Sequence, residues 1–392
     1  MLTSIAFIFV SGLGLGYIST KLKLPALVGL LFTGVILGPY VLNAISPNLL
    51  IIGPDLRKLA LIIILTRAGL SLNIGDLKKV GRPALLMCFV PACFEIIATT
   101  LFAPLLLNIS ILEAAIMGTV IAAVSPAVIV PKMIHLIENK YGTTKSIPQM
   151  IMAGGSIDDV FVIVLFTSFI TLASGETLSA LTWAKIPVSI TTGILSGILL
   201  GGMFSLYFKR FHLRDSAKVI LLLSSAFLIM AFEQATENYF PFSGLLAVMS
   251  IGGTLLFTYP ALAQRLSQKY GKLWVAAEIM LFVLVGATID MQYALASGVP
   301  VILLIFIALV FRMGGVFVST LRTSLTLKER LFCMIAYTPK ATVQAAIGSI
   351  PLGLGLPCGQ IVLTVAVLAI LITAPLGAFA MESTYKKLLT KE

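Results

Sequence analysis

The sequence predicts an all-α polytopic membrane protein with about 13 transmembrane helices. The 392-residue chain is 59% hydrophobic and 11% charged, whereas soluble domains have roughly 45–50% apolar and about 25% charged residues. Its mean hydropathy is +1.07. The apolar runs are continuous and about 20 residues long, as a membrane helix requires. A membrane β-barrel would instead alternate apolar and polar residues over segments of about 10 residues.

The predicted spans follow one another through the chain with short connections. In chain order they cover residues 1–20, 24–43, 51–72, 82–107, 110–136, 147–173, 180–208, 218–236, 240–258, 273–290, 297–320, 330–351 and 359–380. The first span has no basic residue before its apolar run, so we expect a retained helix rather than a cleaved signal peptide.

The basic residues divide sharply between the two sides of this map. Of the 27 Lys and Arg residues, Arg57, Lys58 and Lys185 fall on one side and three more lie within spans, which leaves 21 on the other side. The positive-inside rule then predicts a multi-pass protein of the cell membrane with its N-terminus outside and its C-terminus in the cytoplasm. The asymmetry accounts for the net charge of +11 without a nucleic-acid partner, and we expect none.

Metal or disulfide chemistry is not indicated. The four cysteines lie in apolar runs without a CxxC spacing, and His135 and His212 lie in charged connections. We therefore expect no cofactor and no metal centre built from cysteine and histidine.

Five ionisable residues lie near the middle of predicted spans. With a rise of about 1.5 Å per residue, the depths from the cytoplasmic end are about 16 Å for Asp158, 15 Å for Lys340, 19 Å for Glu95 and 12 Å for Arg312, with Asp159 one residue away. Charges at this depth face one another or water, because facing lipid is costly, and they mark functional sites. Arg67, near a span end, is expected to extend toward the interface instead.

The signs of these charges do not balance. Glu95, Asp158 and Asp159 are acidic, whereas Arg312 and Lys340 are basic, so one carboxylate has no fixed partner. An uncompensated carboxylate suits a mobile cation or a proton. Because adjacent helical residues point about 100° apart, one aspartate can face a neighbouring helix and the other an aqueous cavity. The alternative is a static polar cluster that only joins the helices.

Prolines interrupt two of the spans. Pro126 and Pro131 lie in 110–136, and Pro339 precedes Lys340 in 330–351. A proline within a span removes a backbone hydrogen bond, and irregular backbone at membrane depth is tolerated where it lines a cavity or is buried in protein. Polar residues that could satisfy the freed groups lie nearby: Thr119, Ser125, Thr338, Thr342 and Gln344. The four hydroxyl residues of this set are also possible ion ligands.

The positions of the two interruptions indicate inverted repeats. They lie seven spans apart, so the two spans run in opposite directions, and the same offset relates their neighbours. This pattern is typical of a secondary transporter with its site at the repeat interface. Where two broken helices cross, like helix ends meet, and we expect Lys340 to offset their dipoles. Gly154 and Gly155 would let backbones approach closely beside the aspartates.

These segments resemble the monovalent cation:proton antiporter superfamily, in particular the branch of the mammalian NHA-type sodium/proton exchangers and their bacterial relatives. The matching stretches are "GGSIDDV", "AAVSPAVIVP", "TPKATVQAAIG" and "VAVLAILITAPLGA". The resemblance extends over nearly the whole chain and implies the NhaA/NapA-like fold, in which two discontinuous helices cross.

The resemblance also implies an assembly and a division of labour. The protein would be a homodimer in the lipid bilayer, formed by a single membrane domain, 1–392. A transport part, approximately 82–173 and 297–380, would move as an elevator against a dimerisation part, approximately 1–72 and 180–290. By motif, Asp159 would be the main ion-binding carboxylate and Asp158 its assistant. Arg312 stands where some bacterial members have a lysine, which leaves the stoichiometry open.

The sequence therefore predicts a sodium or lithium/proton antiporter, which is not an enzyme. Hard cations prefer oxygen ligands such as carboxylates, hydroxyls and free carbonyls, so proton and Na⁺ or Li⁺ would compete for Asp159, with Asp158 as a second ligand. If Arg312 and Lys340 stay charged, paired with Glu95 and Asp158 in an order left open, exchange is electroneutral. If Lys340 or Asp158 also titrates, exchange moves net charge.

Other functions fit less well. An aspartyl protease needs two carboxylates sharing a water across two helices, whereas here they are consecutive. The odd charge does not resemble a channel filter. Potassium/proton exchange remains an alternative, because sequence does not reveal cavity size. A sodium-coupled organic-anion symporter could use the same architecture, with a pocket richer in neutral polar groups.

Overall fold

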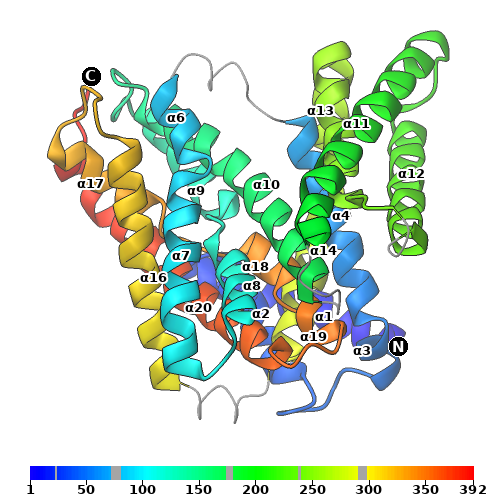
Figure 1. Cartoon of the computed structure of the whole chain (residues 1–392), viewed down its shortest axis with the longest axis horizontal. Helices are drawn as coiled ribbons and strands as arrows, with labels where there is room; N and C mark the ends of the chain where they lie inside the picture. Colours follow the sequence, from blue (N-terminus) through cyan, green and yellow to red (C-terminus); the bar gives the residue numbers. More distant parts are fainter. Residues whose placement is uncertain (23, 72–80, 174–179, 237–239, 290–297) are drawn as a thin grey trace. The chain divides into compact units, whose positions relative to one another are not determined.

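The computed structural model describes residues 1–392 except 23, 72–80, 174–179, 237–239 and 290–297 (Figure 1). In this part of the chain the regular elements are all helices, and a single isolated β-bridge pairs Tyr141 with Lys391. The predicted all-α class is therefore confirmed.

The helices belong to two compact units. The first comprises residues 1–54, 73–173 and 279–392, and the second residues 55–72 and 174–278. The first unit contains α1 (Leu2–Lys21), α2 (Ala26–Leu37), α3 (Pro47–Ile51), α6 (Arg82–Met87), α7 (Val90–Leu107), α8 (Ile111–Ala122), α9 (Pro126–Glu138), α10 (Ile147–Ala173), α16 (Gly298–Ser319), α17 (Leu327–Ala336), α18 (Thr342–Ile347), α19 (Ile350–Gly353) and α20 (Gly359–Leu388).

The second unit holds most of α4 (Gly53–Leu70) together with α11 (Ala180–Arg210), α12 (Asp215–Thr236) and α13 (Gly244–Thr258), and α14 (Pro260–Ala287) contributes residues to both units. Within it, α13 packs against both α11 and α12. Each unit is a group of residues that contact one another, whereas the predicted parts are defined by which residues would move during transport. The predicted division into a transport part and a dimerisation part is therefore not tested and stays a prediction.

Each predicted span overlaps a helix or a broken helix among the described residues, and positions 72, 290 and 297 of the predicted spans lie outside them. Among the described residues, nine helices are long and apolar enough to cross a membrane, and α2 and α13 are shorter apolar helices. The count of 13 is therefore not confirmed. The predicted start of one span was late, because α14 begins at Pro260 rather than at residue 273. Its first turns are polar, so hydropathy does not find them, but Arg, Gln and Lys there are good helix formers.

The two spans predicted to be interrupted by proline, 110–136 and 330–351, are both broken. The first divides into α8 and α9, and the second into α17, α18 and α19. A third interruption was not predicted: span 82–107 divides into α6 and α7 at Cys88 and Phe89, directly before Pro91 in the first turn of α7. Proline is favoured at that position because its missing N–H needs no partner there.

The two broken helices α8–α9 and α17–α19 begin in the same way. Ser110 and Glu113 form a capping box at the start of α8, and Thr326 and Glu329 form another at the start of α17. In each box the hydroxyl and the carboxylate satisfy backbone N–H groups that the first turn leaves free. The shared signature supports the predicted equivalence of the two segments.

Close packing around α7 brings the first unit together. α7 contacts α16 and α8, and α10 contacts α6, α8 and α9. A Cβ on Gly315 of α16 would lie 2.7 Å from Cα of Pro91 on α7, and one on Gly118 of α8 would lie 3.2 Å from Cα of Ile96. Small residues permit such approaches between membrane helices, and α7 is thereby held between two helices that carry or adjoin the buried charges.

A partly buried ion pair stabilises the start of α17. Lys145, on the connection before α10, donates to Glu329 Oε2 at 2.7 Å and to the Ser324 carbonyl at 3.0 Å. Burial would raise the pKa of Glu329, but the Lys145 ammonium and the N–H and hydroxyl of Thr326 bring it below its ordinary value of 4.5. A depressed carboxyl pKa stabilises the folded state above that value, and the contribution is lost as pH falls through the lower folded-state pKa.

Glu329→Gln is therefore expected to destabilise the protein at pH 7 by about 1.5–3 kcal/mol, the usual worth of a hydrogen bond to a charged group. Thermal unfolding of the solubilised protein would show a lower Tm, and the difference from wild type should shrink below about pH 4. Glu113→Gln, at the exposed capping box of α8, is the matched control and should change little. Equal melting of Glu329→Gln and wild type at pH 7 would contradict the assignment.

Candidate functional site

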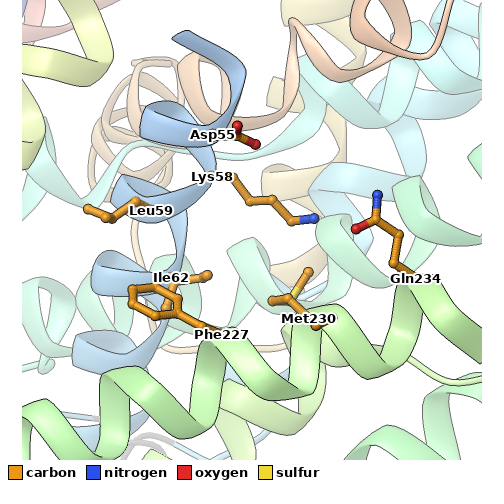
Figure 2. Close-up of a pocket in the computed structure, with 8 residues that line it drawn as sticks. Asp55, Lys58, Leu59, Ile62, Phe227, Met230 and Gln234 are labelled. Carbon is orange, nitrogen blue, oxygen red and sulfur yellow. The ribbon is translucent and has the colours of Figure 1, made fainter. Parts of the chain in front are cut away.

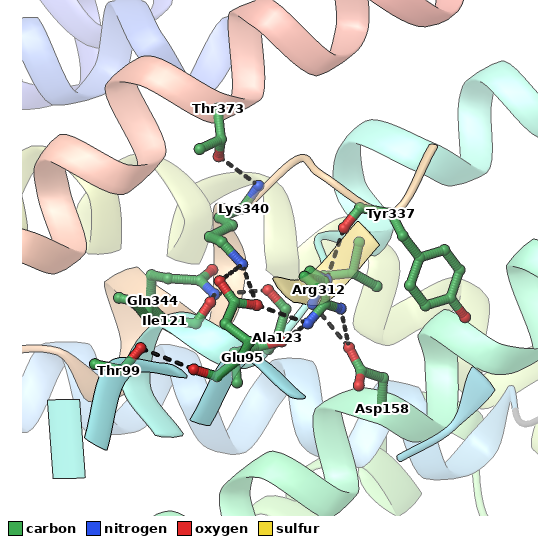
Figure 3. A network of polar contacts seen from close by, with 12 residues as sticks. Glu95, Thr99, Ile121, Ala123, Asp158, Arg312, Tyr337, Lys340, Gln344 and Thr373 are labelled. Atoms are coloured by element: carbon green, nitrogen blue, oxygen red, sulfur yellow. Dashed lines mark hydrogen bonds and ion pairs between the residues drawn. The ribbon is translucent and has the colours of Figure 1, made fainter. Parts of the chain in front are cut away.

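Four of the five predicted intramembrane charges meet in one buried network of the first unit (Figure 3). They come from α7, α10, α16 and the break between α17 and α18. Glu95, Asp158 and Arg312 have no exposed side-chain surface, and Lys340 is 1% exposed. Their similar depths, estimated from the sequence, thus correspond to direct contact.

Arg312 is the centre of the network. Its Nη1 donates to Glu95 Oε2 at 2.9 Å and its Nη2 to Asp158 Oδ2 at 2.7 Å. The sequence left open which acid pairs with Arg312, and the structure shows that both do. The planar guanidinium presents several N–H groups in fixed directions and can therefore join two carboxylates on different helices.

Lys340 completes the network from the other side of Glu95. Its Nζ lies 2.7 Å from Oε1 of Glu95 and donates to Oε2 at 2.8 Å. The backbone N–H of Lys340 donates to Thr373 Oγ1 of α20 at 3.0 Å, which ties the break to that helix. Glu95 is thus shared between two cations, and the four groups together carry two positive and two negative charges.

Arg312 also occupies the C-terminal ends of two half-helices. Its Nε donates to the carbonyl of Tyr337, just after α17, at 2.7 Å, and its Nη1 donates to the carbonyl of Ala122, the last residue of α8. Helix C-termini carry partial negative charge and free carbonyls, so a cation stabilises them. The structure gives this contact to Arg312 rather than to Lys340, whose ammonium is turned toward Glu95.

The two breaks touch each other directly. The N–H of Ser125 donates to the carbonyl of Pro339 at 2.8 Å, and Gln344 Nε2 donates to the carbonyls of Ala123 at 2.7 Å and Ile121 at 3.4 Å. The predicted meeting of two discontinuous helices is confirmed. These bonds satisfy backbone groups that the missing helical turns leave free.

The predicted polar residues on the broken helices differ in their partners. Thr119 donates to the carbonyl of Ile116 in its own helix at 2.7 Å, and Thr338, just after α17, donates to the carbonyl of Ile335 at 2.8 Å. Thr342 is buried at the start of α18. Ser125 Oγ is buried and has no hydrogen-bond partner among the described residues. Of this set, Ser125 therefore has an oxygen available for a ligand.

The two aspartates of α10 have different surroundings. Asp158 Oδ2 accepts from Arg312 and from the N–H of Val124 at 2.9 Å, in the break between α8 and α9. Asp159 points away from it by the helical rotation of about 100°. Its Oδ1 is buried without a hydrogen-bond partner in the described part of the chain, and none of the ion pairs there includes Asp159. Asp159 is the carboxylate left over by the network.

Gly154 and Gly155 permit close contact beside these aspartates, but the neighbours are side chains rather than the helix backbones that were predicted. A Cβ at Gly154 would overlap the hydroxyl oxygen of Tyr337 and lie 2.9 Å from Cβ of Met87, and one at Gly155 would lie 3.1 Å from Val124 Cγ1. Sequence reasoning missed Tyr337 and Thr373 as members of the site. Tyr337 directly precedes the interrupted "TPKATVQAAIG" segment, and this adjacency was the available signal.

Two further observations concern alternative binding sites among the described residues. Among the described residues, no group of three His, Cys, Asp or Glu could hold a metal ion. A pocket of about 250 Å³ lies within the second unit, where Lys58 extends from α4 toward Gln234 of α12 above Ile62, Phe227 and Met230 (Figure 2). It holds one carboxylate, Asp55, which is exposed and beside the Lys58 side chain.

The sequence and the fold of this chain are similar to those of known proteins. Residues 5–384 match the family described as "Sodium/hydrogen exchanger, transmembrane". Human sodium/hydrogen exchanger 9B2 is 30% identical over 97% of this chain and 72% of its own length. Human sodium/hydrogen exchanger 9B1 is 31% identical over 94% of this chain and 73% of its own. The solved structure of the sodium proton antiporter MjNhaP1 from Methanocaldococcus jannaschii has the same fold, with a TM-score of 0.83, 20% identity and 99% coverage of each chain.

Arg312→Lys tests the central position of the guanidinium. Lysine keeps the charge but cannot reach two carboxylates and two helix-end carbonyls together, so buried acceptors lose their partners. We expect a loss of about 3 kcal/mol or more in stability, measured as a Tm several degrees lower in detergent. Arg265→Lys makes the same change at the exposed pair with Asp215 and should leave Tm unchanged. A wild-type Tm in Arg312→Lys would contradict the central role.

Proposed function

Because this chain belongs to the sodium/hydrogen exchanger family, we propose that it is a secondary active antiporter that exchanges Na⁺ or Li⁺ for protons. It is a multi-pass membrane transporter and not an enzyme. The observation that carries the proposal is Asp159, a carboxylate with a buried oxygen and no ion pair in the described residues, adjacent to a charge-balanced network where two broken helices meet.

Asp159 would carry a proton and a cation alternately. Protonation and cation binding each neutralise a carboxylate held away from water, so either occupant makes its burial less costly. The transported ion would also find Asp158 Oδ1 and Ser125 Oγ, two further buried oxygens without hydrogen-bond partners in the described residues. Oxygen donors of this kind are those that hard cations prefer. Competition for one carboxylate couples the two fluxes.

The charge balance of the network supports electroneutral exchange. Glu95 and Asp158 are matched by Arg312 and Lys340 through three ion pairs of 2.7–2.9 Å. If these four keep their charges throughout the cycle, Asp159 alone exchanges, and one proton moves for each cation. The loaded site then has the same net charge in both directions.

We propose the assembly and the moving parts of the protein from the family resemblance, and its membrane orientation from the distribution of basic residues. The protein would be a homodimer in the cell membrane with its N-terminus outside and its C-terminus in the cytoplasm. Residues 82–173 and 297–380, which supply all five charges, would move as an elevator against the dimerisation part, 1–72 and 180–290. The two discontinuous helices contact the charged network directly. They would therefore move together with it and with the bound ion across the membrane.

Asp159→Asn is expected to abolish exchange, because asparagine has no carboxyl group that can lose a proton to water and bind a cation in its place. Everted vesicles from cells without their own exchangers would be acidified inside and given Na⁺, Li⁺ or K⁺ in turn, with a pH-sensitive dye. Wild type should release protons with Na⁺ or Li⁺, and release with K⁺ instead would indicate potassium/proton exchange. Asp215→Asn, at the α12 surface, is the matched control. Full exchange by folded Asp159→Asn would contradict the role of Asp159.

Exchange should be insensitive to the membrane potential. Moving one net charge across the membrane changes the free energy by about 2.3 kcal/mol per 100 mV, so a cycle with unequal charges would be accelerated or slowed strongly. Purified protein in liposomes should exchange at the same rate with and without an imposed potential. A rate that follows the potential would show that Lys340 or Asp158 also titrates.

A further inference from the structure

Tyr337 carries a buried hydroxyl that the network does not use. Its side chain is fully buried, and its hydroxyl oxygen has no hydrogen-bond partner among the described residues. Buried tyrosine hydroxyls normally find a partner, since desolvating an unpaired polar group is costly. The rest of the residue is held firmly, because its carbonyl accepts from Arg312 Nε and its ring centroid lies 5.5 Å from Arg312 Cζ.

The hydroxyl lies against α10, one turn before the aspartates. It occupies the space that a Cβ on Gly154 would take. Gly154 and Asp158 are four residues apart and share one helical face, and helical side chains lean toward the preceding turn. The Asp158 carboxylate therefore extends toward the surface that the hydroxyl covers, and Figure 3 shows the Tyr337 ring and Asp158 on the same side of Arg312.

Asp158 has the complementary deficiency. Its Oδ2 accepts from Arg312 and Val124, whereas its Oδ1 is buried without a hydrogen-bond partner in the described residues. The Tyr337 hydroxyl thus lacks an acceptor, Asp158 Oδ1 lacks a donor, and both groups belong to the surroundings of the same turn of α10. A donor and an acceptor that lie near one turn but are not bonded to each other can be joined by one water molecule between them.

We propose that the Tyr337 hydroxyl is the donor for Asp158 Oδ1 through one bridging water, and that Tyr337 is a positioning residue for the transport site. The bond would hold Asp158 ionised and turned toward Arg312 while Asp159 changes occupant. This inference rests on the proposed antiport, because its readout is the exchange rate. Gly154 is then required as glycine, since any side chain would displace the hydroxyl.

Several other charged or titratable groups lie close enough to Asp158 to influence its charge. They are Arg312 on α16, Glu95 and Cys93 on α7, Cys88 at the end of α6, Lys340 in the break, and Asp159 on the same helix. A substitution that removes only the Tyr337 hydroxyl leaves all of them in place. Its effect on the pH profile can therefore be assigned to that hydroxyl.

The test is the pH dependence of Na⁺/H⁺ exchange by Tyr337→Phe in liposomes. A donor favours the ionised carboxylate, so its removal makes Asp158 easier to protonate. The acid limb of the profile should move to higher pH by about 0.5–1 unit, with the maximal rate at alkaline pH within about twofold of wild type. Tyr270→Phe, at another buried tyrosine, in the second unit, should leave the profile unmoved.

A superimposable profile would overturn the proposal, and so would a uniform loss of rate without a shift, which would indicate packing alone. Absence of exchange in wild type would instead contradict the proposed function itself.

Gly154→Ala provides a second test. It should reduce the exchange rate about tenfold when introduced into wild type, because the new methyl group displaces the hydroxyl. The reduction should be smaller when it is introduced into Tyr337→Phe, where the nearest remaining ring atom would lie 3.4 Å from the new Cβ and only the contact with Met87 Cβ, at 2.9 Å, stays close. Equal losses in the two backgrounds would show that the hydroxyl and Gly154 are not coupled.

Discussion

The burial of the Arg312 guanidinium is the constraint on which the rest of the site depends. A cation without exposed surface in an apolar protein must have its lost hydration replaced by ion pairs and hydrogen bonds. Arg312 obtains this from two carboxylates on α7 and α10 and from two carbonyls at the ends of α8 and α17. Five segments therefore meet at one side chain. The breaks in the two helices supply the carbonyls that accept hydrogen bonds from Arg312, because in intact helices these carbonyls would already be bonded to backbone N–H groups.

The same arrangement explains why one carboxylate remains available. Arg312 and Lys340 balance Glu95 and Asp158, and this part of the network matches a static polar cluster. Asp159 lies outside it by the rotation of a single helical residue. A buried carboxylate without an ion pair must be neutralised by a proton or by a bound cation, and either of these can replace the other. In the proposed function, stability and exchange are thus divided between two adjacent residues of identical chemistry.

Much of this site could be predicted from sequence because its signals are local. Charges in apolar spans, their depths, and prolines at matching positions depend on composition and on helix geometry alone, and they led to the meeting of Glu95, Asp158, Arg312 and Lys340. The pairing within that group was not predictable. Whether Arg312 joins one carboxylate or two depends on helix crossing angles, which no local pattern encodes.

Other features escaped for identifiable reasons. The roles of Tyr337 and Thr373 come from tertiary contacts of residues that look ordinary in an apolar run. The interruption at Cys88 and Phe89 was hidden because Pro91 is also compatible with a continuous span. The polar start of α14 is helical beyond its apolar part, so a hydropathy criterion does not detect it. Hydropathy and proline patterns thus locate a membrane site better than they define its contacts.

The most direct measurement is the number of protons released when the solubilised protein binds its cation. Titration calorimetry with Na⁺ or Li⁺, repeated in buffers with different heats of protonation, gives this number without any membrane gradient. The account predicts one proton released per ion bound, because Asp159 alone exchanges its occupant while the four-charge network stays ionised. Binding without proton release, or with two protons per ion, would contradict it.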